Sequence, residues 1–227
     1  MDYKGLSNLA TMFFDQADHL DSKPFLWNKK EGLYSPRTYK EVADQVCQFA
    51  NGLSAIGIEK GDRVVIVSEN RPEWVIADLA ISAIGAIVVP AYTTNTNEDN
   101  LYILEHSEAK AAIVSTHKLL QRLQGAAVQS IKCETLITID SVLNKGVKGI
   151  AMVSWVDIQT AGLQKPNNIR DEAKLLNRTD LACFIYTSGT GGNPKGVMLT
   201  HGSILANCFS AYDLLTELGL GDEVFLS

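Results

Sequence analysis

The stretch VVIVSENRPEWVIADLAISAIGAIVVP, residues 64–90, sets the fold class. Its two ends are runs of valine and isoleucine, which are typical of buried strands. Between them, Pro72 suits the first turn of a helix and Gly85 can end one. The pattern predicts a strand, a helix and a second strand, which is the repeating unit of a parallel sheet covered by helices.

The same region needs comparison with a membrane span, because residues 74–92 are nearly all apolar. A transmembrane helix requires about 20 such residues. Asp78 lies inside the run, and a charge near the middle of a bilayer costs about 2.5–3.5 kcal/mol on the insertion scale. We therefore expect a helix and then a strand of a water-soluble protein.

The alternation of strands and helices continues on both sides of this unit. Upstream, Thr38 and Glu41 have the spacing of a capping box, and apolar residues recur on one face of the segment that follows. Residues 141–177 are less regular, with one short helix. The predicted strands are 64–67, 86–90, 111–114, 135–139, 181–186 and 197–199, and the predicted helices start near 38, 72, 98, 117, 155 and 202. The expected fold class is α/β, a layered parallel sheet with helices on both faces.

Composition and charge exclude several classes of protein. The 227 residues are 46% apolar, with a mean hydropathy of +0.02, a net charge of −6 and a pI near 5.2, as in ordinary water-soluble proteins. The longest basic run is Lys29–Lys30, so we expect no nucleic-acid-binding surface. The four cysteines form no CxxC pair, which argues against a disulfide framework or a zinc site. The first residues do not resemble a secretory signal.

The most distinctive segment is YTSGTGGNPKGVMLTH, residues 186–201, which follows an apolar predicted strand. It is not a Walker A motif, because the sequence contains no Gly-Lys dipeptide. It is not the GxGxxG motif of dinucleotide-binding folds either, because after Gly189 and Gly191 the third position is Pro194. Neither of the two commonest phosphate-binding motifs therefore explains it.

The segment is nevertheless suited to phosphate. Glycines let backbone N–H groups approach an anion closely, hydroxyls add donors, and Lys195 supplies a full positive charge. A charge-assisted hydrogen bond contributes about 1.5–3 kcal/mol. The alternative is a glycine-rich hairpin with a solvated lysine, and the spacing alone leaves both open. The candidate phosphate-binding residues are Thr187, Ser188, Gly189, Thr190, Gly191, Gly192 and Lys195.

Residues 187–196, TSGTGGNPKG, resemble the phosphate loop of the AMP-forming acyl- and aryl-CoA synthetases, a family that includes firefly-type luciferases and peptide-synthetase adenylation domains. Members usually read TSGTTGxPKG, and the continuation VMLTH also fits. The stretch TYKEVADQVCQFANGLSAIGIEKGDRVVIV resembles the family's opening helix and GDRV turn. The segments SENRPEW and VPAYTTNT are most similar to the long-chain fatty acid branch. The resemblance extends from about Phe13 to the end of the chain.

One position departs from the family pattern. Gly191 stands where most members have threonine or serine. Loss of a hydroxyl that binds a charged phosphate costs about 1.5–3 kcal/mol, or roughly ten- to a hundredfold in affinity. Because glycine also frees the backbone N–H to take the place of the hydroxyl, the departure bears on nucleotide affinity and not on the family.

The resemblance implies a ligase that uses ATP, Mg²⁺ and CoA. In this family the carboxylate of an acid attacks the α-phosphorus of ATP, which gives an acyl-adenylate and pyrophosphate, and the thiol of CoA then displaces AMP. The loop residues would hold the β- and γ-phosphates. The adenylation lysine and the magnesium-binding glutamate of the family would lie beyond Ser227, so we assign no catalytic or metal-binding residue.

The resemblance also implies that the chain is an N-terminal fragment, nearly inactive on its own. Residues 61–227 would be an α/β subdomain with the phosphate-binding loop at 186–196, and residues 1–60 would pack partly on a second subdomain. The favoured function is part of a long-chain fatty acid–CoA ligase, with fatty acid, ATP and CoA as its partners. The alternatives are a ligase for an aryl or medium-chain acid and a non-catalytic nucleotide-binding or interaction module. The expected location is cytoplasmic, with peripheral membrane contact left open.

Other candidate residues carry less weight. Trp74 and Tyr92 lie where an acyl tunnel is conceivable, but we expect both to pack in the core. The segment around His201 is equally explained by a helix cap at Thr200. The remaining histidines lack metal-ligand spacing, so we expect surface or packing roles for His19, His106 and His117.

Overall fold

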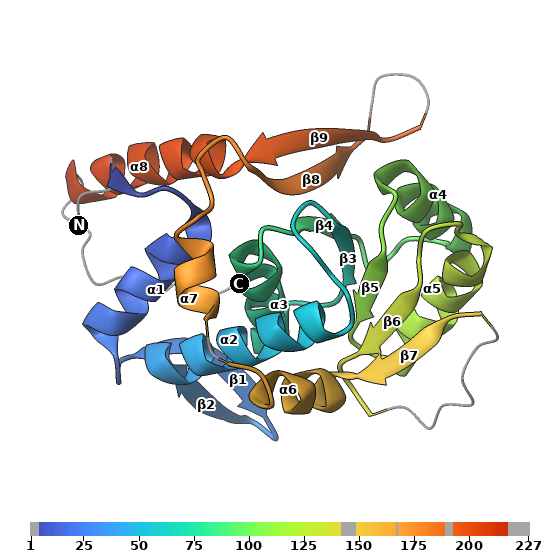
Figure 1. The fold of residues 1–227 in the computed structure, drawn as a ribbon, viewed down its shortest axis with the longest axis horizontal. Coiled ribbons are helices and arrows are strands. Elements are labelled where there is room, and N and C mark those ends of the chain that lie inside the picture. The colour runs from blue at the N-terminus through green and yellow to red at the C-terminus, as the bar shows by residue number, and fades with distance from the viewer. Residues whose placement is uncertain (1–4, 142–148, 167, 189–192, 218–227) are drawn as a thin grey trace.

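The computed structural model describes residues 5–141, 149–166, 168–188 and 193–217. Within them, one sheet has seven strands in the order β7-β6-β5-β3-β4-β8-β9, and β1 and β2 form a separate hairpin (Figure 1). Neighbouring strands of the large sheet are parallel, except that β8 and β9 are antiparallel. The strands are β1 (Pro24–Lys30), β2 (Leu33–Thr38), β3 (Arg63–Val67), β4 (Ile87–Ala91), β5 (Ala111–Val114), β6 (Thr135–Thr138), β7 (Ala151–Ser154), β8 (Leu181–Thr187) and β9 (Lys195–Thr200).

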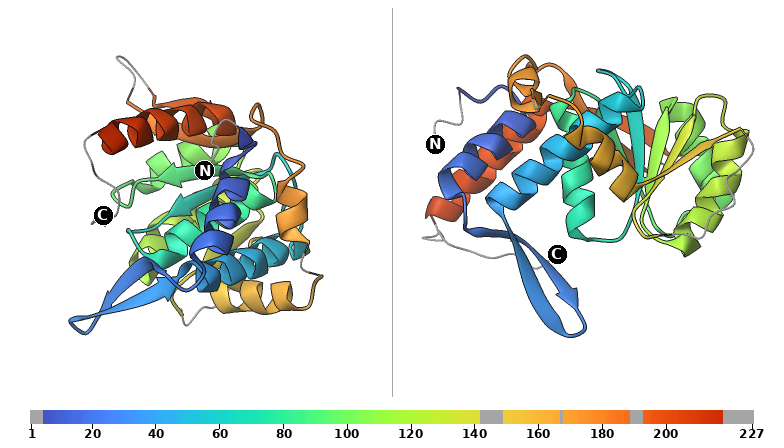
Figure 2. Two further views of the ribbon diagram at one scale, coloured as in Figure 1. Left: turned by 90° about the vertical axis from the view of Figure 1, so that its left-hand side faces the viewer. Right: turned by 60° about the horizontal axis from the view of Figure 1, so that its bottom comes forward.

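Helices cover both faces of this sheet (Figures 1 and 2). Along β3 the side chains alternate, so that Val64 and Ile66 pack with one group of helices while Val65 and Val67 pack with another. The first group comprises α1 (Leu9–Leu20), α2 (Tyr39–Ala55), α3 (Pro72–Ala83), α6 (Trp155–Leu163) and α7 (Ile169–Ala173), and the second comprises α4 (Asn97–Ser107) and α5 (His117–Gln129). The α/β class predicted from residues 64–90 is thus confirmed.

Local signals in the sequence fix where several helices begin. At the start of α2, the Thr38 hydroxyl accepts a hydrogen bond from the Glu41 N–H (3.2 Å), and the Glu41 carboxylate accepts one from the Thr38 N–H (2.7 Å). This is the predicted capping box. Thr96 and Asp99 form the same arrangement at α4. The apolar face of α2 is buried as its spacing predicts, with Val42, Val46, Phe49, Ala50 and Leu53 in the core.

Residues before Arg63 pack on the α/β unit. Phe13 and Phe14 of α1 are buried in the same apolar cluster as α2 and α3. The side chain of Asn8 caps α1 and donates to the carbonyl oxygen of Ala173 at 2.8 Å, while Arg178 donates to the carbonyl oxygen of Leu6 at 2.8 Å. Additional packing of residues 1–60 on a second subdomain stays a prediction.

Several elements were not predicted from the sequence, namely α1, β1, β2, β7 and α7. Figure 2 shows that the β1–β2 hairpin stands away from the rest of the chain, and its residues are mostly exposed, so it lacks the apolar alternation that marks a strand. Residues 74–92 form most of α3 and all of β4, as predicted, and among the described residues we find no helix that could span a bilayer.

Candidate phosphate-binding site

The predicted phosphate-binding segment begins where β8 ends, at Thr187. Because β8 runs parallel to β4, it ends at the same edge of the sheet as β3, β4, β5 and β6. The carboxyl edge of a parallel sheet is where α/β folds bind their ligands. The fold therefore places the segment at the edge that suits binding.

The segment connects two antiparallel strands. In the register of β8 and β9, Thr187 is paired with Lys195. The side chains of Thr187, Ser188 and Lys195 are all exposed. The structure therefore brings two hydroxyls and one ammonium group to the end of a hairpin, a set that can donate to an anion. The other candidates lie outside the described residues, namely Gly189, Thr190, Gly191 and Gly192.

The hairpin form bears on the two alternatives left open by the sequence. A glycine-rich connection between antiparallel strands is what the second alternative predicts, and the exposed Lys195 fits it too. The same geometry suits a phosphate site, since an anion must reach these donors from solvent. The hairpin geometry is therefore compatible with both alternatives. A measurement of phosphate or nucleotide binding decides between them.

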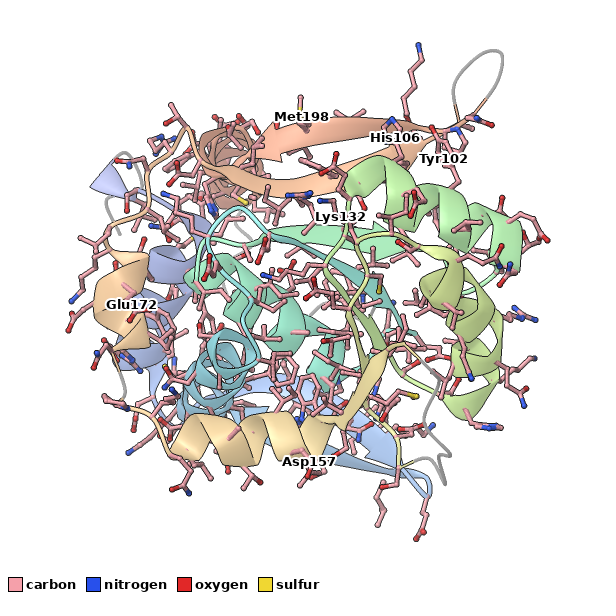
Figure 3. The ribbon with its side chains drawn as sticks, turned by 45° about the vertical axis from the view of Figure 1, so that its right-hand side comes forward. Tyr102, His106, Lys132, Asp157, Glu172 and Met198 are labelled. Atoms are coloured by element: carbon pink, nitrogen blue, oxygen red, sulfur yellow. The ribbon has the colours of Figure 1, made fainter. Side chains whose placement is uncertain are left out.

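A cluster of aromatic side chains supports the hairpin near its loop end (Figure 3). Tyr186 of β8 is buried, and its hydroxyl lies 2.8 Å from Nδ1 of His106 in α4. One turn earlier in α4, the hydroxyl of Tyr102 donates to the carbonyl oxygen of Pro194 at 2.8 Å. Burial raises the pKa of Tyr186 to about 12, so its hydroxyl keeps its proton near neutral pH.

The sequence did not point to Tyr102 or Tyr186, and for His106 it predicted only a surface or packing role. Tyr102 and His106 are four residues apart on α4 and hence on one face of the helix. Their partners, however, lie on β8 and just before β9. A contact between segments so distant in the chain leaves no local signal in a single sequence.

Polar residues that follow the neighbouring strands are paired with one another. After β3 and β5, the hydroxyl of Ser115 donates to the carboxylate of Glu69. Arg71 forms ion pairs with Glu73 (2.7 Å) and with Asp140, which follows β6 (2.9 Å). These side chains already bind one another, so we do not assign them to ligand binding.

The remaining candidates have structural roles or none. His201 is fully buried, and the Leu9 N–H donates to its Nδ1 at 3.4 Å. Burial lowers the pKa of His201. Thr200 accepts from the Ser203 N–H at 3.2 Å, as a cap of α8 (His201–Glu217) should. Trp74 packs against the core as predicted.

The expectation for Tyr92 is wrong. Its side chain is 70% exposed, because it follows β4 at the carboxyl edge of the sheet instead of lying beneath a helix. All four cysteines are free thiols. Within the described ranges, no three His, Cys, Asp or Glu side chains are grouped so as to bind a metal ion. We therefore assign none of these residues to Mg²⁺.

Comparison with known proteins identifies the family. The profile described as AMP-binding enzyme matches residues 13–227. The chain belongs to the AMP-binding enzyme family. The adenylation domain of a carboxylate reductase from Mycobacterium chelonae has the same fold, with a TM-score of 0.75 and 19% identity over 88% of this chain and 35% of that one.

Two relatives within the AMP-binding enzyme family carry informative names. Long chain acyl-CoA synthetase 1 of Arabidopsis thaliana is 34% identical over 182 residues, which are 78% of this chain and 27% of that protein. Long-chain-fatty-acid–CoA ligase FadD15 of Mycobacterium tuberculosis is 30% identical over 201 residues, 87% of this chain and 32% of that protein. The chain thus spans about a third or less of the relatives that it matches.

Proposed function

We propose that this chain carries the phosphate-binding part of an ATP-dependent ligase that joins a long-chain fatty acid to CoA. The observation that carries the proposal is the pairing of Thr187 with Lys195 at the tip of the β8–β9 hairpin, in a chain of the AMP-binding enzyme family. Two relatives are named for long-chain acyl substrates, which supports the long-chain acid.

In the proposed reaction, a carboxylate oxygen of the acid bonds to the α-phosphorus of ATP, and the bond from that phosphorus to the bridging oxygen of pyrophosphate breaks. The thiol of CoA then displaces AMP from the acyl-adenylate. The departing pyrophosphate gathers negative charge as its bond breaks. Donors held in place near that charge stabilise the transition state more than the ground state.

The residues of this chain would act on the β- and γ-phosphates. Lys195 would offset their charge, and the hydroxyls of Thr187 and Ser188 would donate to their oxygens. The glycines at 189, 191 and 192 would let backbone N–H groups approach. When bound, Mg²⁺ would neutralise phosphate charge, and the protein groups that hold it would come from outside the described residues.

Replacing Lys195 tests this assignment. In the enzyme of full family length that carries this chain, we expect Lys195→Ala to lower fatty-acid-dependent ATP–pyrophosphate exchange roughly ten- to a hundredfold, which is what loss of a charge-assisted hydrogen bond costs. Thermal unfolding should not change, because the side chain is exposed. Lys40→Ala, at an exposed lysine of α2, is the matched control and should leave exchange unchanged.

The same assay separates the alternatives. Exchange that depends on palmitate supports the long-chain acid, whereas exchange driven only by benzoate-type or medium-chain acids points to one of the other ligases. Binding of Mg-ATP without exchange for any acid favours the non-catalytic module. Equal exchange in wild type and Lys195→Ala would remove the role assigned to the hairpin.

A further inference from the structure

The β8–β9 hairpin lies at one edge of the large sheet, where β8 is next to β4. In the described residues, β8 and β4 share one register pair, Val88 with Cys183, and β9 is the last strand at that edge. By comparison, β3 is paired with β4 along all five of its residues. Side-chain contacts from a neighbouring helix add to this backbone pairing near Thr187 and Lys195.

Helix α4 supplies those contacts to both strands of the hairpin (Figure 3). Tyr102 holds the carbonyl group that directly precedes Lys195, through the 2.8 Å hydrogen bond to Pro194. His106 holds the other strand through the hydroxyl of Tyr186, which directly precedes Thr187. One helix thus contacts both Tyr186, which precedes Thr187, and Pro194, which precedes Lys195.

The rings make this support rigid. Tyr102 stacks on His106 with ring centres 5.3 Å apart, and its edge faces the ring of Tyr186 at 6.3 Å. Aromatic pairs of these geometries contribute about 0.5–1.5 kcal/mol each beyond the area they bury. A hydroxyl on a stacked ring has little freedom, so the hydrogen bonds to the hairpin have a fixed direction.

A glycine of the hairpin completes the arrangement. Gly196 is paired with Tyr186 in the register of β8 and β9. A Cβ atom at this position would lie 3.3 Å from the ring of Tyr186, closer than an ordinary contact. The absence of a side chain at Gly196 thus lets the tyrosine ring lie against β9 with its hydroxyl directed at His106.

We propose that Tyr102 and His106 are positioning residues for the phosphate site, holding the two strand ends from which Thr187 and Lys195 project. This inference rests on the proposed function, because it assigns a purpose to the geometry of the hairpin. The gain is preorganisation, since donors that are already in place lose less conformational entropy when the phosphates bind. The effect belongs to phosphate binding and not to overall folding.

Tyr102→Phe isolates one contact, because phenylalanine keeps the ring stack and removes only the hydroxyl. Two quantities would be measured on this chain: amide hydrogen exchange of peptides that cover residues 187–196, and calorimetric affinity for Mg-pyrophosphate. We expect faster exchange and a dissociation constant about three- to tenfold higher, as the loss of one hydrogen bond implies. His106→Phe should have a similar effect, greater at the β8 end.

Tyr34→Phe is the matched control, because this exposed tyrosine lies on the separate β1–β2 hairpin. It should change neither quantity. Tyr34→Phe and Tyr102→Phe should unfold thermally like the wild type, whereas His106→Phe should unfold at a lower temperature, because it removes the His106 partner of the buried Tyr186 hydroxyl. Unchanged affinity in both Tyr102→Phe and His106→Phe would overturn the positioning role, even if exchange became faster. A wild-type chain that does not bind Mg-pyrophosphate would contradict the proposed site itself, and exchange alone would then decide whether α4 holds the hairpin.

Discussion

At the scale of single residues, Asp78 combines burial with charge. Its carboxylate is the charge that argues against a membrane span over residues 74–92. In α3 it lies between the buried residues Ala77 and Ala80. Desolvation raises the pKa of Asp78 to about 6. Burial, together with the nearby charge of Asp78, raises the pKa of the Cys183 thiol on β8 to about 11. The charged form of Asp78 is therefore unfavourable in the folded protein.

The sign of the pH effect follows from that pKa. A carboxyl whose pKa is raised by folding stabilises the fold below its unfolded pKa of 3.8, and this contribution is lost as pH rises through about 6. We expect Asp78→Asn to raise the free energy of unfolding at pH 7.5 by about 1–2 kcal/mol. This is less than the full pKa shift implies, because the side chain is only half-buried and solvent screens its charge. Urea unfolding across pH 5 to 8 measures it.

The difference in free energy of unfolding between Asp78→Asn and wild type should decrease as pH falls, because the wild-type carboxyl then becomes neutral. Asp213→Asn is the control, at an exposed aspartate of α8, and should not reproduce the trend. A difference between Asp78→Asn and wild type that is constant over this pH range would show that the charge of Asp78 is not its cause.

At the scale of elements, α2 and α6 pack with their backbones nearly in contact. A Cβ atom at Gly162 of α6 would lie 1.8 Å from the carbonyl oxygen of Gln48 in α2. A Cβ atom at Gly52 of α2 would lie 2.0 Å from the carbonyl oxygen of Ile158 in α6. Both distances are shorter than any real contact, so only glycine allows these helices to lie so close. In the sequence, Gly162 belongs to an irregular stretch and suggests nothing of the kind.

Substituting this glycine should separate the two helices. We expect Gly162→Ala to lower the free energy of unfolding by at least about 2 kcal/mol, because the new methyl group meets backbone and not a movable side chain. Chemical denaturation measures the change. In Gly125→Ala the methyl group would meet only the side chain of Asn97, and alanine favours the interior of α5. This control should stay within about 1 kcal/mol of wild type, and equal losses in both variants would contradict the steric explanation.

At the scale of the whole molecule, the sequence predicts what depends on neighbours along the chain. Strands β3, β5 and β6 and the starts of α2, α3 and α5 match their predicted positions closely, because capping residues and apolar periodicity are local signals. The family motif likewise predicts that Thr187 and Lys195 belong to the proposed phosphate site. The antiparallel pairing of β8 with β9 matches the glycine-rich hairpin that the sequence offered as one alternative. The contacts of Tyr102 and His106 with the hairpin could not be predicted, because they join α4 to segments about 80 to 90 residues further along the chain.

The strand order has a consequence for the course of folding. The pairing of β3 with β4 closes a short stretch of chain, whereas β8 meets β4 only across roughly a hundred residues, and the entropic cost of closing a loop grows with its length. Synthesis and refolding should therefore build the centre of the sheet first and add the phosphate-binding hairpin last. The region proposed to bind the nucleotide would then form only after the rest of the sheet has folded. Pulse-labelled hydrogen exchange should find the amides of β3 protected before those of β9.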